Sequence, residues 1–380
     1  MLAPDDLKPP AGPLERLPEE WGAQLKAWGE PRFRAAQVFG WIHRRGVTDP
    51  AAMSNLPKRL RARLSEEGLG PLMAVDRAHV SDDGTRKLLL RMGDGRPVES
   101  VLIPQGSSGA DDPIGGEETE VGGRPVTQCI SSQVGCAMAC VFCASGMAGL
   151  KRQMSAGEIV SQLLLGRAAV AEGDRLRNVV FMGMGEPLHN YDAVARALTL
   201  MFHPDGLGFG TRRVTVSTSG LVPEIDRLGR DFGGKVQLAI SLHVPDDERR
   251  SALMPINRKY PLGEVMEAVR RYPLPPRRRI TIEYTLVRGY NDDLADAGRL
   301  AVLLEGLRVK VNLIPMNPVP DNPLGPPPWD VVEAFHDRLW DAGVPTFVRR
   351  RKGDDIAAAC GQLALEGETK KVRVPLPVTG

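Results

Sequence analysis

Long apolar runs are absent from this sequence: no continuous stretch reaches the roughly 18 residues that a membrane-spanning helix needs. No membrane segment is therefore expected. Residues 1–21 are acidic and rich in proline, and they lack the apolar core of a signal peptide. We accordingly expect a cytoplasmic protein.

Neither sign of charge is in large excess, and cysteine is scarce. The 49 basic and 47 acidic residues leave a net charge of +2, which neither requires nor excludes a nucleic-acid partner. Five cysteines in 380 residues, an odd number with three clustered, do not form the disulfide framework of a secreted protein. In a reducing compartment, clustered cysteines more often bind a metal.

Most of the chain alternates between apolar, β-branched segments and helical segments. One helical segment opens with a capping box of Ser155 and Glu158. Six β-then-α units predict an α/β fold with a parallel sheet covered by helices, in the form of a partial (βα)6 barrel of the TIM type. The active site is expected at the carboxyl ends of the strands. The strand segments are VTQCISS, NVVFMGM, RRVTVSTS, VQLAISLH, RITIEYTLV and VKVNLIPM.

Three parts are expected along the chain. Residues 1–70 form a small basic helical unit, whose charges are either a solvated face or a contact surface for RNA. Residues 71–121 contain a short β-meander, with turn signals at Asp83-Gly84 and Asp94-Gly95, and most of a mobile Gly-rich loop at 105–124. Residues 122–380 form the barrel core and its C-terminal segment.

The stretch GCAMACVFCASG places Cys136, Cys140 and Cys143 in the spacing Cys-x3-Cys-x2-Cys. Thiolates select zinc or iron–sulfur clusters. A structural zinc site needs a fourth ligand, and no second Cys-x2-Cys or His-x3-His pair exists here. Three thiolates on a [4Fe–4S] cluster leave one iron open, and this spacing matches the enzymes that use such a cluster to split S-adenosylmethionine (SAM). Zinc binding and chance clustering of buried cysteines are the alternatives.

Polar residues follow several of the expected strands. The stretch GMGEP (183–187) offers flexible backbone and the carboxylate of Glu186 to the amino group of SAM. Later strand ends carry residues that can bind ribose hydroxyls or the adenine edge, although each alone is more often a satisfied polar side chain. They are Ser217, Ser241, His243 and Asn317.

Two cysteines remain outside the cluster. Cys129 lies on the strand that leads into the cluster loop, and Cys360 lies in GDDIAAACGQLA. A lone cysteine is by default a buried, inert thiol. If both faced the same site, they could serve as a nucleophile and a resolving thiol.

Taken together, long motifs over roughly residues 30–365 resemble the radical-SAM adenine C2 methyltransferases of RNA, the RlmN/Cfr family. They are CISSQVGCAMACVFCASG, VVFMGMGEPLHNYDAV, RRVTVSTSGLVPEIDRLG, LAISLHVPDDERRSALMPINRKYPL, TIEYTLVRGYND, VNLIPMNPVP and GDDIAAACGQLA.

The resemblance implies a reaction that uses two SAM molecules. Cys360 takes a methyl group from one SAM, and the second SAM, at the cluster, generates the radical that activates this S-methyl group for addition to C2. Cys129 then resolves the protein–RNA adduct and forms a transient disulfide with Cys360. Glu99 falls at the position of the proton acceptor. The implied SAM-binding residues are Gly185, Glu186, Ser217, Ser241, Leu242, His243 and Asn317.

The implied partners are large-subunit rRNA and/or tRNA, and an electron donor such as flavodoxin or ferredoxin. Plausible RNA-holding surfaces are the N-terminal helices and the arginine runs PPRRR (275–279) and VRRRK (348–352). A C8-directed RNA methyltransferase and a radical-SAM enzyme with a non-RNA substrate are the alternatives. We expect a monomer.

Sensitivity to oxygen follows from the open iron. Purification in air should destroy the cluster and abolish activity, and anaerobic reconstitution with iron and sulfide should restore both. Elemental analysis of protein purified without oxygen should find iron and acid-labile sulfide in place of zinc. A fully active enzyme without iron would contradict this expectation.

Overall fold

Ten strands form one curved sheet in the order β1-β2-β3-β4-β7-β8-β9-β10-β11-β12. The computed structural model describes residues 2–106, 123–320, 322–349 and 351–363, so most of the expected loop at 105–124 lies outside the described residues. The strands are β1 (Met73–Val80), β2 (Arg86–Met92), β3 (Pro97–Pro104), β4 (Arg124–Cys129), β7 (Asp174–Phe181), β8 (Val214–Thr218), β9 (Gln237–Ser241), β10 (Ile280–Leu286), β11 (Val309–Pro315) and β12 (Thr346–Val348).

The sheet has an antiparallel and a parallel part. Neighbours from β1 to β4 are antiparallel, as the turn signals predicted for a meander. Neighbours from β4 through β7 to β12 are parallel, which confirms the expected α/β fold. The six predicted strand segments correspond to β4 and β7–β11, and the short β12 continues the parallel part. Both ends of the sheet are open, so the barrel is partial.

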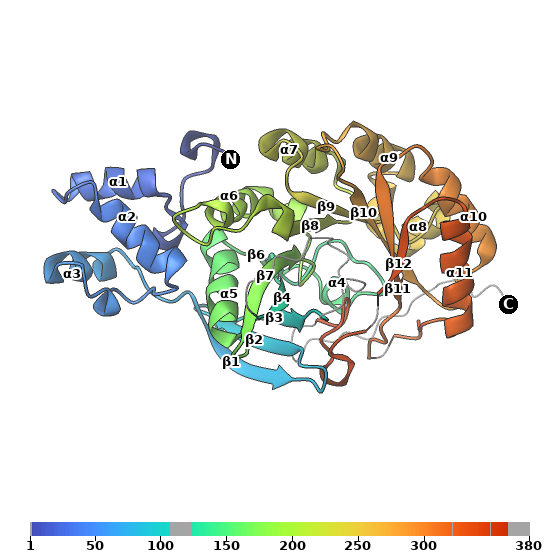
Figure 1. Cartoon of the computed structure of the whole chain (residues 1–380), viewed down its shortest axis with the longest axis horizontal. Helices are drawn as coiled ribbons and strands as arrows, with labels where there is room; N and C mark the ends of the chain where they lie inside the picture. The colour runs from blue at the N-terminus through green and yellow to red at the C-terminus, as the bar shows by residue number, and fades with distance from the viewer. Residues whose placement is uncertain (1, 107–122, 321, 350, 364–380) are drawn as a thin grey trace.

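Helices cover the outer face of this sheet. Helix α4 and the loop that carries Cys136, Cys140 and Cys143, here called the cysteine loop, lie inside its curve (Figure 1). The capping box at the start of α5 is present, since Ser155 Oγ accepts from the Glu158 N–H and the Glu158 carboxylate accepts from the Ser155 N–H. None of the helices in the described ranges is long and apolar enough to cross a membrane. The barrel helices are α4 (Ala144–Ala148), α5 (Ala156–Ala169), α6 (Tyr191–Phe202), α7 (Val222–Phe232), α8 (Asp247–Leu253), α9 (Leu262–Arg271), α10 (Leu294–Leu303) and α11 (Trp329–Asp341).

Three further helices at one end of the molecule precede the sheet, namely α1 (Pro18–Ala27), α2 (Arg34–Phe39) and α3 (Lys58–Glu66) (Figure 1). They pack against the barrel through aromatic contacts. The Phe39 ring lies 4.7 Å from the ring of His203, which follows α6, and 4.5 Å from the ring of His43. This unit and the barrel therefore share one apolar core.

The buried His43 predicts a stability loss in acid. Burial, with the nearby His203, lowers the pKa of His43 to about 3, whereas the unfolded chain has a value near 6.5. Between these pH values the unfolded chain binds more protons, so the free energy of unfolding falls as the pH falls, by up to about 1.4 kcal/mol per pH unit for this group.

Urea denaturation at several pH values between 7.5 and 4 tests this expectation. His43→Gln should flatten the pH dependence by that amount, because the titrating group is gone. His79→Gln is the control, because His79 is exposed on β1 and its removal should leave the slope as it is. Equal slopes for His43→Gln and the wild type would refute the assignment.

Candidate active site

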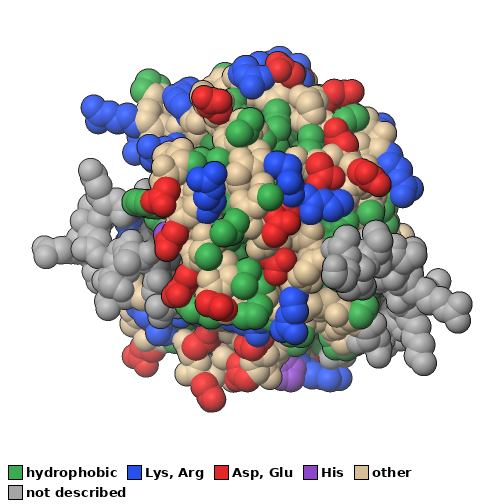
Figure 2. All heavy atoms as spheres, turned by 90° about the vertical axis from the view of Figure 1, so that its right-hand side faces the viewer, with side chains coloured by type: hydrophobic (Ala, Val, Ile, Leu, Met, Phe, Trp, Pro, Cys, Tyr) green, Lys and Arg blue, Asp and Glu red, His purple; other side chains and the backbone are tan. Residues whose placement is uncertain are grey.

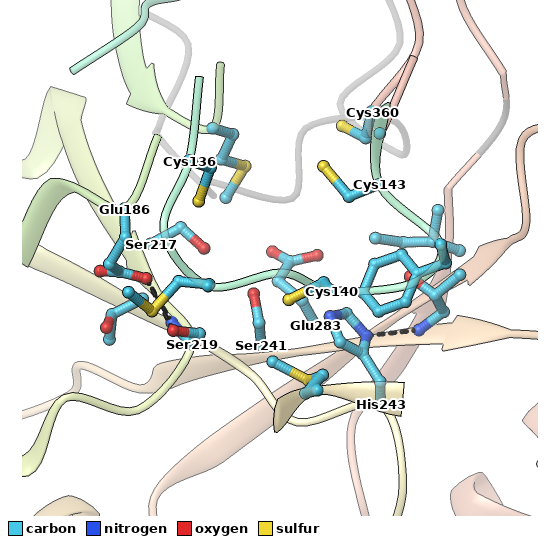
Figure 3. A pocket seen from close by; sticks show the side chains of 18 of the residues that line it. Cys136, Cys140, Cys143, Glu186, Ser217, Ser219, Ser241, His243, Glu283 and Cys360 are labelled. Atoms are coloured by element: carbon cyan, nitrogen blue, oxygen red, sulfur yellow. Dashed lines mark hydrogen bonds between the residues drawn. The ribbon is translucent and has the colours of Figure 1, made fainter. Parts of the chain in front are cut away.

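A cavity opens at the carboxyl ends of the parallel strands, where the sequence places it. It encloses about 940 Å³ of empty space, counting the part open to solvent, which lies within the ~300–1,000 Å³ range of small-molecule and cofactor sites. Residues from the ends of β7 to β12 line it together with the cysteine loop. Figure 3 shows the labelled side chains pointing into this cavity from both sides.

The cysteine loop is tied down at both ends. A two-stranded antiparallel sheet, β5 (Gln133–Val134) with β6 (Arg152–Gln153), closes its base. Ala139 has a left-handed backbone with φ of 54°, and Cys143 is the residue that precedes α4. Cys136, Cys140 and Cys143 all line the cavity (Figure 3), so the structure brings the three predicted ligands together.

These three thiols disfavour ionisation when nothing is bound between them. Burial raises the pKa of Cys136 to about 12 and that of Cys140 well above its usual value, and it also raises the pKa of Cys143. The charges of neighbouring cysteine thiolates add to the shift at Cys136 and Cys140. A cationic group bound here would remove this penalty, since ligand thiols must lose their protons.

The thiols of the site fit an iron–sulfur cluster. Cys136, Cys140 and Cys143 line one cavity, and thiolates that each bind a different iron of one cluster would share such a space. The donor set is soft and contains no carboxylate, which also fits an iron–sulfur cluster.

The loop after β7 makes a close approach that only glycine permits. Gly185 has φ of +98°, and a Cβ there would lie 2.5 Å from the Cβ of Gln133. The Gln133 side chain accepts from the Glu186 N–H at 2.8 Å. The Glu186 carboxylate, fully buried with a raised pKa, accepts from the backbone of Leu188 and from Ser219 N and Oγ. It organises the loop, and its role toward SAM stays a prediction.

Three more predicted residues line the cavity at the ends of β8 and β9: Ser217, Ser241 and His243. His243 Nδ1 accepts from the Thr285 N–H at 2.9 Å, so its proton is on Nε2, and burial lowers its pKa to about 3. The ring is therefore neutral. Leu242 is different, because its side chain lies in the core and is not among the described residues that line the cavity.

Cys360 lines both this cavity and a smaller one beside it, and Cys129 lines the second. A negative charge on Cys360 contributes, after burial, to raising the pKa of Cys129 to about 12, while Arg349 opposes the shift. The structure therefore brings the two thiols to one place. Both are free thiols, so the expected Cys129–Cys360 disulfide is not present in the structure.

Hydrogen bonds fix the backbone around Cys360. Asn317 Nδ2, from the end of β11, donates to the Cys360 carbonyl at 2.9 Å, and the Ala144 N–H donates to the Gly361 carbonyl at 2.9 Å. Because Ala144 is the first residue of α4, the C-terminal segment is attached directly to the cysteine loop.

Glu99 lies on β3 with its side chain 8% exposed, and its carboxylate pairs with Lys87 at 3.2 Å. Glu99 is not among the described residues that line either cavity, so the substrate would have to approach a proton acceptor at this position.

Sequence reasoning did not single out three charged residues of the site. Arg250 of α8 donates to the carbonyls of Ser219, Ser241 and Leu242, which ties α8 to the chain at the ends of β8 and β9. Glu283 and Arg349 line the cavity, Glu283 buried and Arg349 partly buried. All three lie in stretches quoted in the sequence analysis, but their contacts in the site could not be predicted, because their partners come from distant strands.

The two arginine runs lie at opposite ends of the barrel. Arg277 to Arg279 precede the amino end of β10, away from the cavity, where the Arg278 guanidinium binds the Lys235 carbonyl. This location makes the PPRRR run a poor candidate for holding RNA at the site. Arg349, Arg351 and Lys352 line the second cavity.

Gly185 provides a test of the cofactor site. Gly185→Ala forces a side chain into Gln133 and should displace the loop, so SAM binding measured by calorimetry on the reconstituted protein should weaken at least about tenfold. Gly289→Ala is the control, because Gly289 has φ of +66° but no atom within 4 Å of an added Cβ. It isolates the cost of the backbone conformation, about 1–2 kcal/mol. Equal SAM affinities in the two variants would refute the close approach.

Comparisons with known proteins agree with this geometry. Residues 130–301 match the family model of the Radical SAM superfamily, and residues 19–68 match the Ribosomal RNA large subunit methyltransferase N-terminal domain. The Dual-specificity RNA methyltransferase RlmN of Sorangium cellulosum is 61% identical, over 96% of this chain and 98% of that protein. The protein of the same name from Geobacter sulfurreducens is 48% identical, over 88% and 87%.

A solved structure shares the whole fold. The crystal structure of a radical SAM methyltransferase from Sphaerobacter thermophilus matches 93% of this chain and 99% of that chain, with 45% identity and a TM-score of 0.85. With the cysteine geometry, these matches confirm the expected family and fold. The chain belongs to the RlmN family of radical-SAM methyltransferases, which work with a [4Fe–4S] cluster and SAM.

Proposed function

We propose that this protein methylates C2 of an adenine in large-subunit rRNA and/or tRNA, using two SAM molecules and an S-methylated Cys360. The observation that carries the proposal is the position of Cys360, which faces the cavity of the three cluster thiols and shares a second cavity with Cys129. The relatives named as dual-specificity RNA methyltransferases support the choice of RNA.

C2 of adenine is electron-poor and a weak nucleophile, so polar methyl transfer does not work there. When bound, the cluster and SAM supply the one-electron chemistry that such a carbon requires. The protein holds the acceptor sulfur in place, because Asn317 and Ala144 bind the backbone carbonyls of Cys360 and Gly361. Cys136, Cys140 and Cys143 hold the cluster.

Cys129 then attacks the Cys360 sulfur as a thiolate, and the bond between that sulfur and the methylene carbon on the RNA breaks. The carbon keeps the electron pair and takes up a proton to become the methyl group, and the two cysteines are left as a disulfide. Two electrons from a cellular thiol reductant return the disulfide to the free thiols. Burial raises the pKa of the Cys129 thiol, and the positive charge of Arg349 opposes that rise and so favours the attacking thiolate. Glu99 accepts the proton that leaves C2, as the resemblance implies.

RNA reaches the site over basic surface near the second cavity and the N-terminal unit. Arg351 and Lys352 line the second cavity, and Arg44, Arg45, Lys58, Arg59 and Arg63 are exposed on the N-terminal unit. The face that carries α10 and α11 instead shows basic, acidic and apolar side chains interspersed (Figure 2). The target adenine leaves its stack to enter, which costs a few kcal/mol unless it already lies in a loop.

The enzyme works as a monomer in the cytoplasm and takes its electrons from a small redox protein of the flavodoxin or ferredoxin type. The accessory unit of residues 1–70 contacts the RNA, and residues 71–121 connect it to the core of residues 122–380. The SAM-binding positions are those given above, with Leu242 contributing through its backbone.

Variants of the two thiols test the proposal. Cys360→Ala should abolish C2 methylation of RNA, because the methyl carrier is gone. Cys129→Ala should be isolated with covalently attached RNA, because the adduct is not resolved. The measurements are mass spectrometry of nucleosides after anaerobic reaction and a denaturing gel of the protein.

The outcomes separate the alternative functions. Full C2 methylation by Cys360→Ala would overturn the proposed mechanism. The appearance of 8-methyladenine in place of 2-methyladenine would assign a C8-directed enzyme. SAM cleavage without any RNA modification would assign a non-RNA substrate.

A further inference from the structure

Lys87 of β2 connects two parts of the site that are far apart in the sequence. Its ammonium group lies 3.2 Å from the Glu99 carboxylate and donates to the Ala357 carbonyl at 3.3 Å. The side chains of Lys87 and Glu99 are only 15% and 8% exposed. A charge that is this shielded from water needs an opposite charge beside it, so the Lys87 ammonium and the Glu99 carboxylate stabilise each other.

The strand register places this contact on the side of the sheet that bears the resolving thiol. Lys87 is paired with Val101, and Val101 is paired with Cys129. Directly paired residues point to the same side of a sheet, and residues two apart on a strand do so as well. Lys87, Glu99 and Cys129 therefore share one side, next to the segment of residues 353–363 that carries Cys360.

Loss of the Lys87 side chain would leave Cys360 held by other contacts. Four hydrogen bonds that do not involve Lys87 fix the same segment: Gly353 N to Asp83 Oδ2 at 3.1 Å, Ser81 Oγ to Asp355 Oδ1 at 2.5 Å, Asn317 Nδ2 to the Cys360 carbonyl at 2.9 Å and Ala144 N to the Gly361 carbonyl at 2.9 Å. Removing the Lys87 side chain should therefore change the position of the Glu99 carboxylate and leave Cys360 in place.

We propose that Lys87 is a positioning residue that holds the Glu99 carboxylate in a set place relative to the segment bearing Cys360, so that Glu99 can take the proton from C2 of the adenine. This inference rests on the proposed function. Lys87 is not among the described residues that line either cavity, and it acts through Glu99. Its two contacts, to the Glu99 carboxylate on β3 and to the Ala357 carbonyl of the C-terminal segment, fix the position of Glu99 relative to the Cys360 sulfur.

The test is a single-turnover reaction of the anaerobically reconstituted full-length chain with an RNA fragment. Lys87→Met should slow release of methylated RNA at least about tenfold, toward the ~10²–10⁴-fold that positioned proton transfer contributes. The covalent protein–RNA adduct should accumulate on a denaturing gel. S-methylation of Cys360, measured by mass spectrometry of the peptide, should stay at the wild-type level, which also shows that the variant is folded and loaded.

Three further variants separate positioning from a purely structural role. Lys87→Arg should restore release, because a guanidinium can reach both acceptors. Glu99→Gln should accumulate the adduct as Lys87→Met does, and the double variant should be no slower than either single one, because both act on one step. Arg91→Met is the matched control on the same strand, since Arg91 pairs with Asp76 at 2.6 Å with its side chain 45% exposed.

The results decide as follows. Wild-type release by Lys87→Met, or additive effects in the double variant, would overturn the inference while the proposed function stands. Loss of Cys360 methylation in Lys87→Met, with no rescue by Lys87→Arg, would assign Lys87 a structural role and also overturn it. Absence of 2-methyladenine from wild-type and Arg91→Met reactions would remove the proposed function itself, and the inference with it.

Discussion

The site depends on the free-energy cost of ionising three neighbouring thiols in a buried space. Each thiol of the cysteine loop resists ionisation because it is shielded from water, and at Cys136 and Cys140 the neighbouring thiolates add to that resistance. A bound cationic cluster would offset this cost, since its positive charge stabilises the three thiolates. The fold supplies the rigidity, through β5 and β6 at the base of the loop and the C-terminal segment that packs onto α4.

The parallel sheet explains why distant residues meet at this loop. Because β4 and β7–β12 run in the same direction, their carboxyl ends and the loops after them face one cavity. Arg250 binds three carbonyls at the ends of two of these strands, β8 and β9, and Asn317 binds the Cys360 backbone. The antiparallel meander has a second role, because it contributes Glu99 and Lys87 at the edge of the parallel part.

Sequence patterns predicted the local features well. The spacing of Cys136, Cys140 and Cys143 is contained in one loop, and the strand alternation and the capping box at Ser155 depend on near neighbours only. The general location of Cys129 and Cys360 beside the cluster came from a family resemblance and agrees with their shared cavity. The roles of the individual SAM-binding residues and of Glu99 stay predictions.

The amino-acid sequence by itself determined the grouping of three cysteines in one loop, the order of strands and helices and the family, because each of these is encoded in contiguous or regularly spaced residues. Only the tertiary structure decided that Arg349 lies beside Cys129 and Cys360, that Glu283 is buried in the cavity and that Lys87 joins Glu99 to Ala357. These contacts join residues that are far apart in the chain. They arise from strand register and loop packing, which no short motif specifies.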